Sequence, residues 1–134
     1  MCLYAITKRI ESPSMRERWA WKAFRGTPSK PVFLFRKLAR RSLVQTGRWL
    51  RAEGRNIRPG CADDHTYPAG FHAFATRREA RDFNFIYAAE LVLKVRVRGV
   101  ETVGIQSGLT CLVCREMYVP KPKGNPRGKK GAAR

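Results

Sequence analysis

Acidic side chains are scarce in this sequence. It holds 10 Asp and Glu against 28 Lys and Arg, a formal net charge of +18 at pH 7. A surplus of this size informs about partners and solubility rather than about fold. The polyanions that it favours are DNA, RNA, an anionic membrane surface or an acidic protein. Residues 1–58 carry 15 basic and 3 acidic side chains, residues 59–119 carry 7 of each, and residues 120–134 carry 6 basic and none acidic.

Long apolar runs are also missing. No segment approaches the roughly 18 consecutive apolar residues that a membrane span needs. Lys8, Arg9 and Glu11 interrupt the N-terminal segment, so no secretory signal is recognised. We therefore expect a cytoplasmic protein without a membrane partner. The four cysteines (Cys2, Cys61, Cys111 and Cys114) are then expected to be free thiols.

The length of 134 residues predicts one domain. The last 15 residues, 120–134, combine Pro, Gly and Lys with no apolar period, which predicts a disordered basic tail. The folded domain should therefore span residues 1–119. Whether the tail has a function is left open.

Short strands dominate the expected secondary structure. They are predicted at residues 2–7, 19–24, 31–35, 47–52, 71–75, 91–98 and 109–119. The turn residues between Gly26 and Pro31 predict a hairpin. Trp19, Trp21 and Ala23 share one side of their strand, opposite Lys22, and we expect the tryptophans in the core.

The strand at residues 91–98 is the clearest in the chain. Leu91, Leu93, Val95 and Val97 alternate with Val92, Lys94, Arg96 and Arg98, which predicts an apolar inside and a basic outside. Gly99 and Gly104 should bracket a turn region.

One helix is expected after Thr76. Thr76 and Glu79 have the spacing of a capping box, in which each side chain bonds the backbone N–H of the other residue. The predicted fold class is α+β: a mostly antiparallel β-sheet of about six short strands, with one helix packed on a face.

Nucleic acid, DNA or RNA, is the leading partner hypothesis. Cationic side chains neutralise phosphates, and exposed aromatic rings can stack on unpaired bases. No helix-turn-helix, zinc finger or RNP motif is present, so binding should be weakly sequence-specific and non-catalytic. The candidate binding residues are Arg36, Lys37, Arg40, Arg41, Arg48, Arg51, Lys94, Arg96, Arg98, Lys129 and Lys130.

An enzyme is a further hypothesis. Removal of Met1 would expose Cys2 as an N-terminal thiol beside its own amine, a local base. His72 and Glu116 could supply acid–base groups. The alternatives are a Cys2 packed in a first strand and a hydrogen-bonded structural His72.

Metal binding is weakly supported. Cys111 and Cys114 form a CxxC without a second ligand pair, and residues three apart on a strand point to opposite faces. We expect no metal and no cofactor.

Two segments and a C-terminal strand resemble small, uncharacterised phage and prophage proteins. The segments are Met1-Cys-Leu-Tyr4 and Gly70-Phe-His-Ala-Phe74, the latter followed by a helix, and the strand includes Cys114-Arg-Glu-Met117. The resemblance implies a phage-type accessory protein and brings no activity with it. It suggests that Cys2, His72 and Glu116 belong together. The alternative to nucleic-acid binding is an inhibitor that docks on an acidic host protein through its basic surface.

Overall fold

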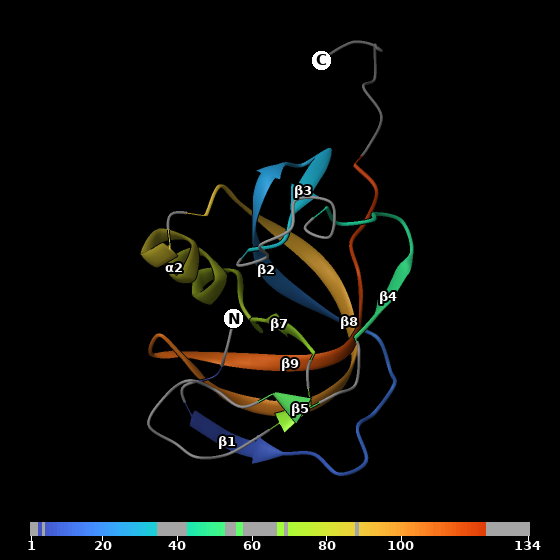
Figure 1. Cartoon of the computed structure of the whole chain (residues 1–134), viewed down its shortest axis with the longest axis vertical. Helices are drawn as coiled ribbons and strands as arrows, with labels where there is room; N and C mark the ends of the chain where they lie inside the picture. Colours follow the sequence, from blue (N-terminus) through green and yellow to red (C-terminus); the bar gives the residue numbers. More distant parts are fainter. Residues whose placement is uncertain are drawn as a thin grey trace.

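The computed structural model describes residue 3 and residues 5–34, 43–52, 56–57, 67–68, 70–87 and 89–122. Figure 1 shows strands β1 (Ala5–Arg9), β2 (Arg18–Thr27), β3 (Lys30–Val32), β4 (Trp49–Arg51), β5 (Asn56–Ile57), β6 (Tyr67–Pro68), β7 (Phe71–Ala73), β8 (Leu91–Gln106) and β9 (Leu109–Tyr118), and helix α2 (Arg77–Tyr87). The predicted α+β class, with a mostly antiparallel sheet and one helix on a face, is confirmed for these residues.

Seven of the described strands form one sheet in which every pairing is antiparallel. The order is β3-β2-β8-β9-β4, with β1 added to β8 and β7 added to β9. Strands β5 and β6 pair separately. The long strands β8 and β9 therefore carry most of the other strands as neighbours.

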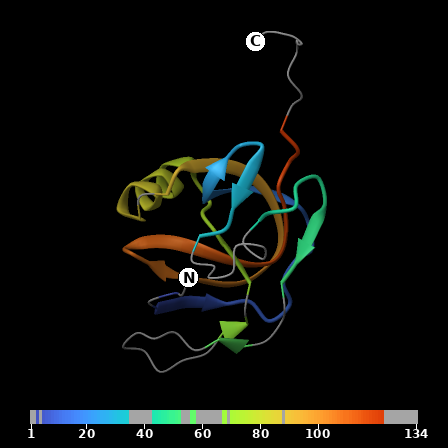
Figure 2. The ribbon, with the colours of Figure 1, turned by 45° about the horizontal axis from the view of Figure 1, so that its top comes forward.

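The sheet curls strongly, as the arc of β8 and β9 in Figure 2 shows. The curl brings the end of β7 back to β2. Trp21 and Phe74 exchange two backbone hydrogen bonds of 2.8 Å across this join. The path β2–β8–β9–β7 thus returns to its own beginning, and the free edges of these strands are reduced.

Strand β8 is twice as long as predicted, and the turn expected at Gly99–Gly104 does not exist. Both glycines lie inside the strand. Gly99 has a φ of 71° and donates its N–H to the Ser14 carbonyl at 2.9 Å. A Cβ on Gly104 would lie 2.3 Å from the Ala5 carbonyl oxygen, so glycine allows β1 to approach. The chain reverses instead at Ser107 and Gly108, both with positive φ.

Two clusters of buried side chains lie on opposite faces of β2. Phe24 and Ala20 belong to the first, with Val95 and Val97 of β8. Ala23 belongs to the second, which helix α2 covers with Ala80 and Phe83. We call the side of the sheet that carries α2 the helix face.

The start of α2 follows the predicted cap in part. The Glu79 N–H donates to Thr76 Oγ1 at 3.2 Å, as expected. The Glu79 carboxylate, however, accepts from the Thr76 hydroxyl at 2.9 Å instead of from its backbone N–H. No helix of the described residues is long and apolar enough to cross a membrane.

The tryptophans of β2 contradict the prediction that they lie in the core. Trp19 is 47% exposed on the helix face, and Trp21 is only half-buried. The opposite side of the strand carries Ala20, Lys22 and Phe24, all buried. Lys22 is accommodated because its Nζ donates to the His72 carbonyl at 2.5 Å.

Other boundaries differ less. The first strand begins at Ala5, and Cys2 lies outside the described residues. The hairpin partner predicted at residues 31–35 is shorter, Lys30–Val32. The predicted tail lies outside the described residues from position 123 onward.

Candidate nucleic-acid interface

Aromatic and cationic side chains lie next to one another across four strands on the helix face. The pairing register explains the row: Trp19 of β2 lies opposite Arg96 of β8, Arg96 lies opposite Tyr118 of β9, and Tyr118 lies opposite Trp49 of β4. Directly opposite residues point to the same face of an antiparallel sheet. We call this set the cation–aromatic stripe; its members are Trp19, Trp21, Trp49, Lys94, Arg96, Arg98 and Tyr118.

The cations of the stripe lie over its rings. Lys94 Nζ is 4.6 Å from the Trp19 ring centroid and 5.6 Å from that of Trp21. The Arg96 guanidinium carbon is 5.1 Å from Trp19 and 5.5 Å from Tyr118. Such contacts are worth about 0.5–1 kcal/mol each at exposed sites, so they hold long side chains in place without burying their charge.

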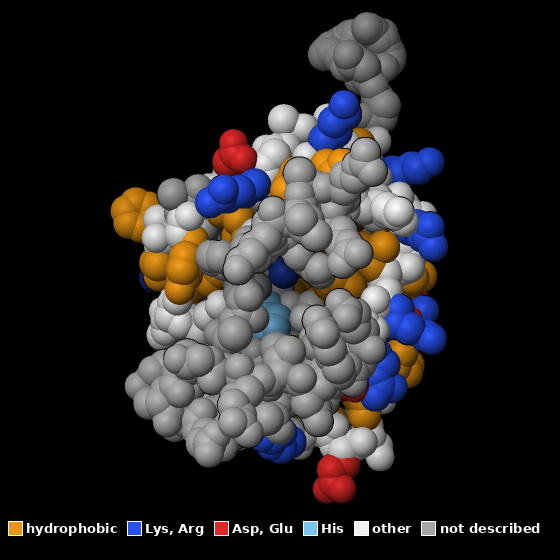
Figure 3. Space-filling view, viewed as in Figure 1, with side chains coloured by type: hydrophobic (Ala, Val, Ile, Leu, Met, Phe, Trp, Pro, Cys, Tyr) orange, Lys and Arg blue, Asp and Glu red, His pale blue; other side chains and the backbone are white. Residues whose placement is uncertain are grey.

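The stripe continues to the edge strand β4. The Arg98 guanidinium carbon lies 3.9 Å from the Trp49 ring centroid, and the Trp49 and Tyr118 rings are 5.6 Å apart. In Figure 3, Lys and Arg side chains interleave with hydrophobic ones along the margin that β4 occupies in Figure 1. This pattern offers rings for stacking and cations for phosphates on one surface.

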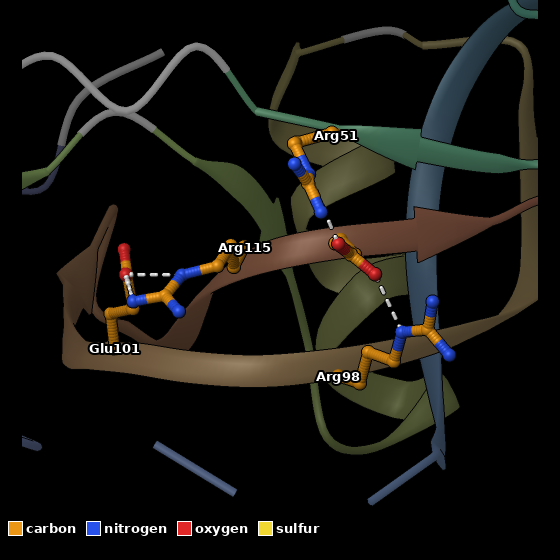
Figure 4. Close-up of polar contacts among 5 residues, drawn as sticks. Arg51, Arg98, Glu101 and Arg115 are labelled. Atoms are coloured by element: carbon orange, nitrogen blue, oxygen red, sulfur yellow. Dashed lines mark hydrogen bonds and ion pairs between the residues drawn. The ribbon is translucent and has the colours of Figure 1, made fainter. Parts of the chain in front are cut away.

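A buried carboxylate fixes two of the arginines at this edge. Glu116 of β9 lies opposite both Arg98 of β8 and Arg51 of β4. Its Oε1 accepts from Arg98 Nε at 2.6 Å, and its Oε2 accepts from Arg51 Nε at 3.2 Å (Figure 4). The hydrogen bond from Arg98 is the main reason that the pKa of Glu116 is lowered. The carboxylate therefore stays ionised and orients both guanidinium groups.

A groove adjoins the stripe where the segment before β2 runs beside β8. It has a volume of about 540 Å³. A second hollow of about 320 Å³ lies next to it and shares two of its residues, Glu17 and Arg18. The lining of the groove is Ile10, Ser12, Ser14, Arg16, Glu17, Arg18, Arg98, Gly99 and Val100, and that of the second hollow adds Trp19 and Arg96.

Four of the predicted nucleic-acid-binding residues come together at this surface. Lys94, Arg96 and Arg98 form the predicted ridge along β8, and Arg51 meets Arg98 through Glu116. Arg48 is exposed immediately before β4. The remaining predicted residues, Arg36, Lys37, Arg40, Arg41, Lys129 and Lys130, lie outside the described residues.

The described part of the chain does not bring the predicted catalytic residues together in one site. Cys2 lies outside it. His72 pairs with Val113, three residues from Glu116 along β9, a separation of about 10 Å. His72 is 5% exposed, its Nδ1 lies 3.2 Å from the Gly70 carbonyl, and burial followed by the charge of Lys22 lowers its pKa to about 3. Both Glu116 oxygens are bonded to arginine, so this carboxylate is a poor proton acceptor.

The two described cysteines are buried and unpaired with each other. Cys111 belongs to the cluster under α2, and Cys114 belongs to the first cluster. Burial raises the pKa of each thiol to about 12. Neither is therefore a thiolate at neutral pH, the form that binds metals and attacks electrophiles. No group of three metal-ligating side chains occurs in the described part of the chain.

Sequence reasoning missed Tyr118, Glu17 and Arg18, together with the exposure of Trp19. Alternation along β2 gave the correct two sides of the strand but not which side faces out. The size of the side chains was an available signal. One side of β2 carries the small Ala20, whereas the other side carries two tryptophans, which need more covering surface than the one predicted helix offers. Comparison with protein-family models, with curated proteins and with solved structures finds no match for this chain.

Proposed function

We propose that this protein binds single-stranded nucleic acid on the cation–aromatic stripe, non-catalytically and with weak sequence specificity, as a small phage-type accessory protein. The observation that carries the proposal is the set of cations that lie over aromatic rings across β2, β8, β9 and β4. Unpaired bases stack on aromatic faces for about 1–3 kcal/mol each, and every base offers such a face.

The charge around the stripe supports the same ligand. The stripe and its adjoining groove contain five cationic side chains, Arg16, Arg18, Lys94, Arg96 and Arg98, against the one carboxylate of Glu17. The ion pair of Arg51 and Glu116 adjoins them at the edge strand β4. Phosphate neutralisation by such groups releases counterions and gives affinity that falls with salt. The contacts of the cations with rings also pre-order them, which reduces the entropy lost on binding.

The test is fluorescence anisotropy with a labelled single-stranded 12-mer at several salt concentrations. Trp19→Ala should weaken binding by about 5- to 150-fold through lost stacking. The double variant Lys94→Ala/Arg96→Ala should reduce the slope of log affinity against log salt by about 0.7 for each phosphate that is no longer neutralised. Arg25→Ala is the matched control, because Arg25 is exposed on β2 about 20 Å from Trp19.

Binding that is independent of salt, or equally weakened by Arg25→Ala, would contradict the proposal. Tighter binding to a duplex of the same sequence would contradict the single-stranded preference. An acidic protein partner, the alternative, would use the same cations. In that case the wild-type protein would capture a protein partner from nuclease-treated host lysate, and the variant Lys94→Ala/Arg96→Ala would not. The wild-type protein would show no binding to the oligonucleotide.

A further inference from the structure

The groove beside the stripe has the size and chemistry of a site for one nucleotide. Its volume of about 540 Å³ lies within the range of small-molecule pockets, about 300–1,000 Å³. Trp19 lies beside it, since the neighbouring hollow that shares Glu17 and Arg18 with the groove is lined by Trp19 and Arg96. A nucleotide whose base stacks on Trp19 would therefore have its sugar and phosphate near this groove.

Three arginines line the groove and are the candidates for contacts with a phosphate. Arg16 and Arg18 come from the segment that leads into β2, and Arg98 comes from β8. Arg98 is held in place by its 2.6 Å hydrogen bond to Glu116. Planar guanidinium groups match phosphate oxygens in geometry as well as charge.

Glu17 is the residue that a general phosphate site does not explain. Its carboxylate repels phosphates, yet it lines both hollows and is 49% exposed there. Its Oε1 lies 3.5 Å from Arg96 Nη1, which leaves acceptor capacity on both oxygens. A carboxylate accepts hydrogen bonds from hydroxyl groups, and carboxylates recognise ribose hydroxyls in this way at nucleotide sites.

The serines of the groove add to this sugar-binding character. Ser12 and Ser14 both line it, and Ser14 Oγ accepts from the Arg16 backbone N–H at 3.2 Å. Internal sugars of a nucleic-acid strand carry a free hydroxyl only in RNA, where the 2′-hydroxyl both donates and accepts.

We infer that the groove binds a ribonucleotide within an RNA strand, with Glu17 accepting a hydrogen bond from the 2′-hydroxyl and the arginines holding the adjacent phosphate. This inference rests on the proposed function and names its ligand as RNA rather than DNA. The base lies toward Trp19. Glu17 therefore contacts the sugar of the nucleotide, and Trp19 stacks on its base.

The experiment compares two 12-mers that differ only in the sugar, oligo(rU) and oligo(dU), by anisotropy at one salt concentration. Wild-type protein should bind oligo(rU) about three- to ten-fold more tightly, the size of one hydrogen bond. A 2′-O-methyl oligo(U) should behave as oligo(dU), because it lacks the donor. Glu17→Ala should lower oligo(rU) affinity to the oligo(dU) level and leave oligo(dU) affinity unchanged or slightly higher.

Two further variants serve as controls for the Glu17→Ala result. Glu17→Gln retains a carbonyl acceptor and should keep part of the RNA preference. Glu11→Ala removes one exposed carboxylate from the same segment but outside the groove, so it should leave the preference intact.

The outcomes separate the inference from the function on which it rests. Equal binding of oligo(rU) and oligo(dU) by wild type, or an equal change of both affinities in Glu17→Ala, overturns the ribose inference and leaves single-strand binding standing. Absence of salt-dependent binding to both oligonucleotides overturns the two together. Circular dichroism of each variant confirms that it is folded.

Discussion

The helix face of the sheet has two halves that differ in what covers them. Near the end of β2, Ala23 lies under α2 in a cluster with Phe74 and Phe83, all at most 3% exposed. Near its start, Trp19 is 47% exposed, and its ring contacts the cations Lys94 and Arg96. One strand thus serves the core at one end and faces outward at the other.

The difference teaches how a small domain separates stability from binding. Small, aliphatic and phenylalanine side chains without polar atoms fill the covered half, where packing is dense. The open half uses large rings and long cationic stems, which cover the sheet with their own carbon atoms and keep polar groups in water. Substitutions should therefore affect stability in the first half and affinity in the second.

The largest expected effect is in the covered half. Phe83 is fully buried, with its ring centroid 5.1 Å from that of Phe74 and 4.5 Å from that of Tyr87. Phe83→Ala should lower the free energy of unfolding by about 3–5 kcal/mol because it leaves a cavity. Urea unfolding measures this, with Phe85→Ala as the control, since Phe85 is 88% exposed. A decrease below about 1 kcal/mol would show that α2 is not packed as described.

His72 predicts a pH dependence of the covered half. Its folded pKa of about 3 lies below the ordinary value of 6.5, so the unfolded chain binds more protons between these values. Stability present above pH 6.5 should fall by about 1 kcal/mol per pH unit as the pH decreases toward 3. Unfolding curves from about pH 7 to about pH 5 measure the slope, and His72→Gln should flatten it. An unchanged slope in the variant would assign the effect to other groups.

Glu116 tests whether the open half contributes to the fold at all. Its pKa is lowered in the folded state, so its contribution is complete above the unfolded value near 4.5 and is lost as the pH falls through the folded value. Glu116→Gln should cost about 1–3 kcal/mol at neutral pH through weakened charged hydrogen bonds. Chemical unfolding at neutral pH measures this. Full stability in the variant would mean that the carboxylate serves only to orient Arg51 and Arg98.

The smallest expected effect on stability comes from the exposed ring. Trp19→Ala should change the free energy of unfolding by less than about 0.5 kcal/mol beyond the contribution of its cation–π interactions. Urea unfolding of this variant, set beside its reduced affinity, completes the comparison. A decrease comparable with that of Phe83→Ala would erase the distinction between the two halves.

The fold was largely predictable because its signals are local. Alternation predicted that Val95 and Val97 lie inside and that Arg96 lies outside. In the structure the two valines are buried and Arg96 is exposed. Thr76 and Glu79 marked the start of α2. Gly99 and Gly104 misled because glycine signals a turn in sequence but also permits a close approach of chains, and only the tertiary structure distinguishes the two.

The candidate interface was predictable only in part. The basic ridge on β8 follows from alternation within one strand. The stripe does not, since Trp19, Tyr118 and Trp49 join it through pairing between segments far apart in sequence. The groove depends on the irregular segment before β2, which no periodicity describes.

The pairing of β1, β2, β4 and β7 with β8 or β9 also has a consequence for synthesis. The hairpins β2–β3 and β8–β9 are local elements of the sheet, whereas β1, β2, β4 and β7 all pair with β8 or β9, which are made later. The ribosome delivers about 5–20 residues per second, so β1 and β2 emerge seconds before their partners. In the most basic half of the chain, β1 and one edge of β2 therefore stay unpaired for this time, next to the ribosome's own RNA, and the sheet is complete only when the β8–β9 hairpin has left the tunnel.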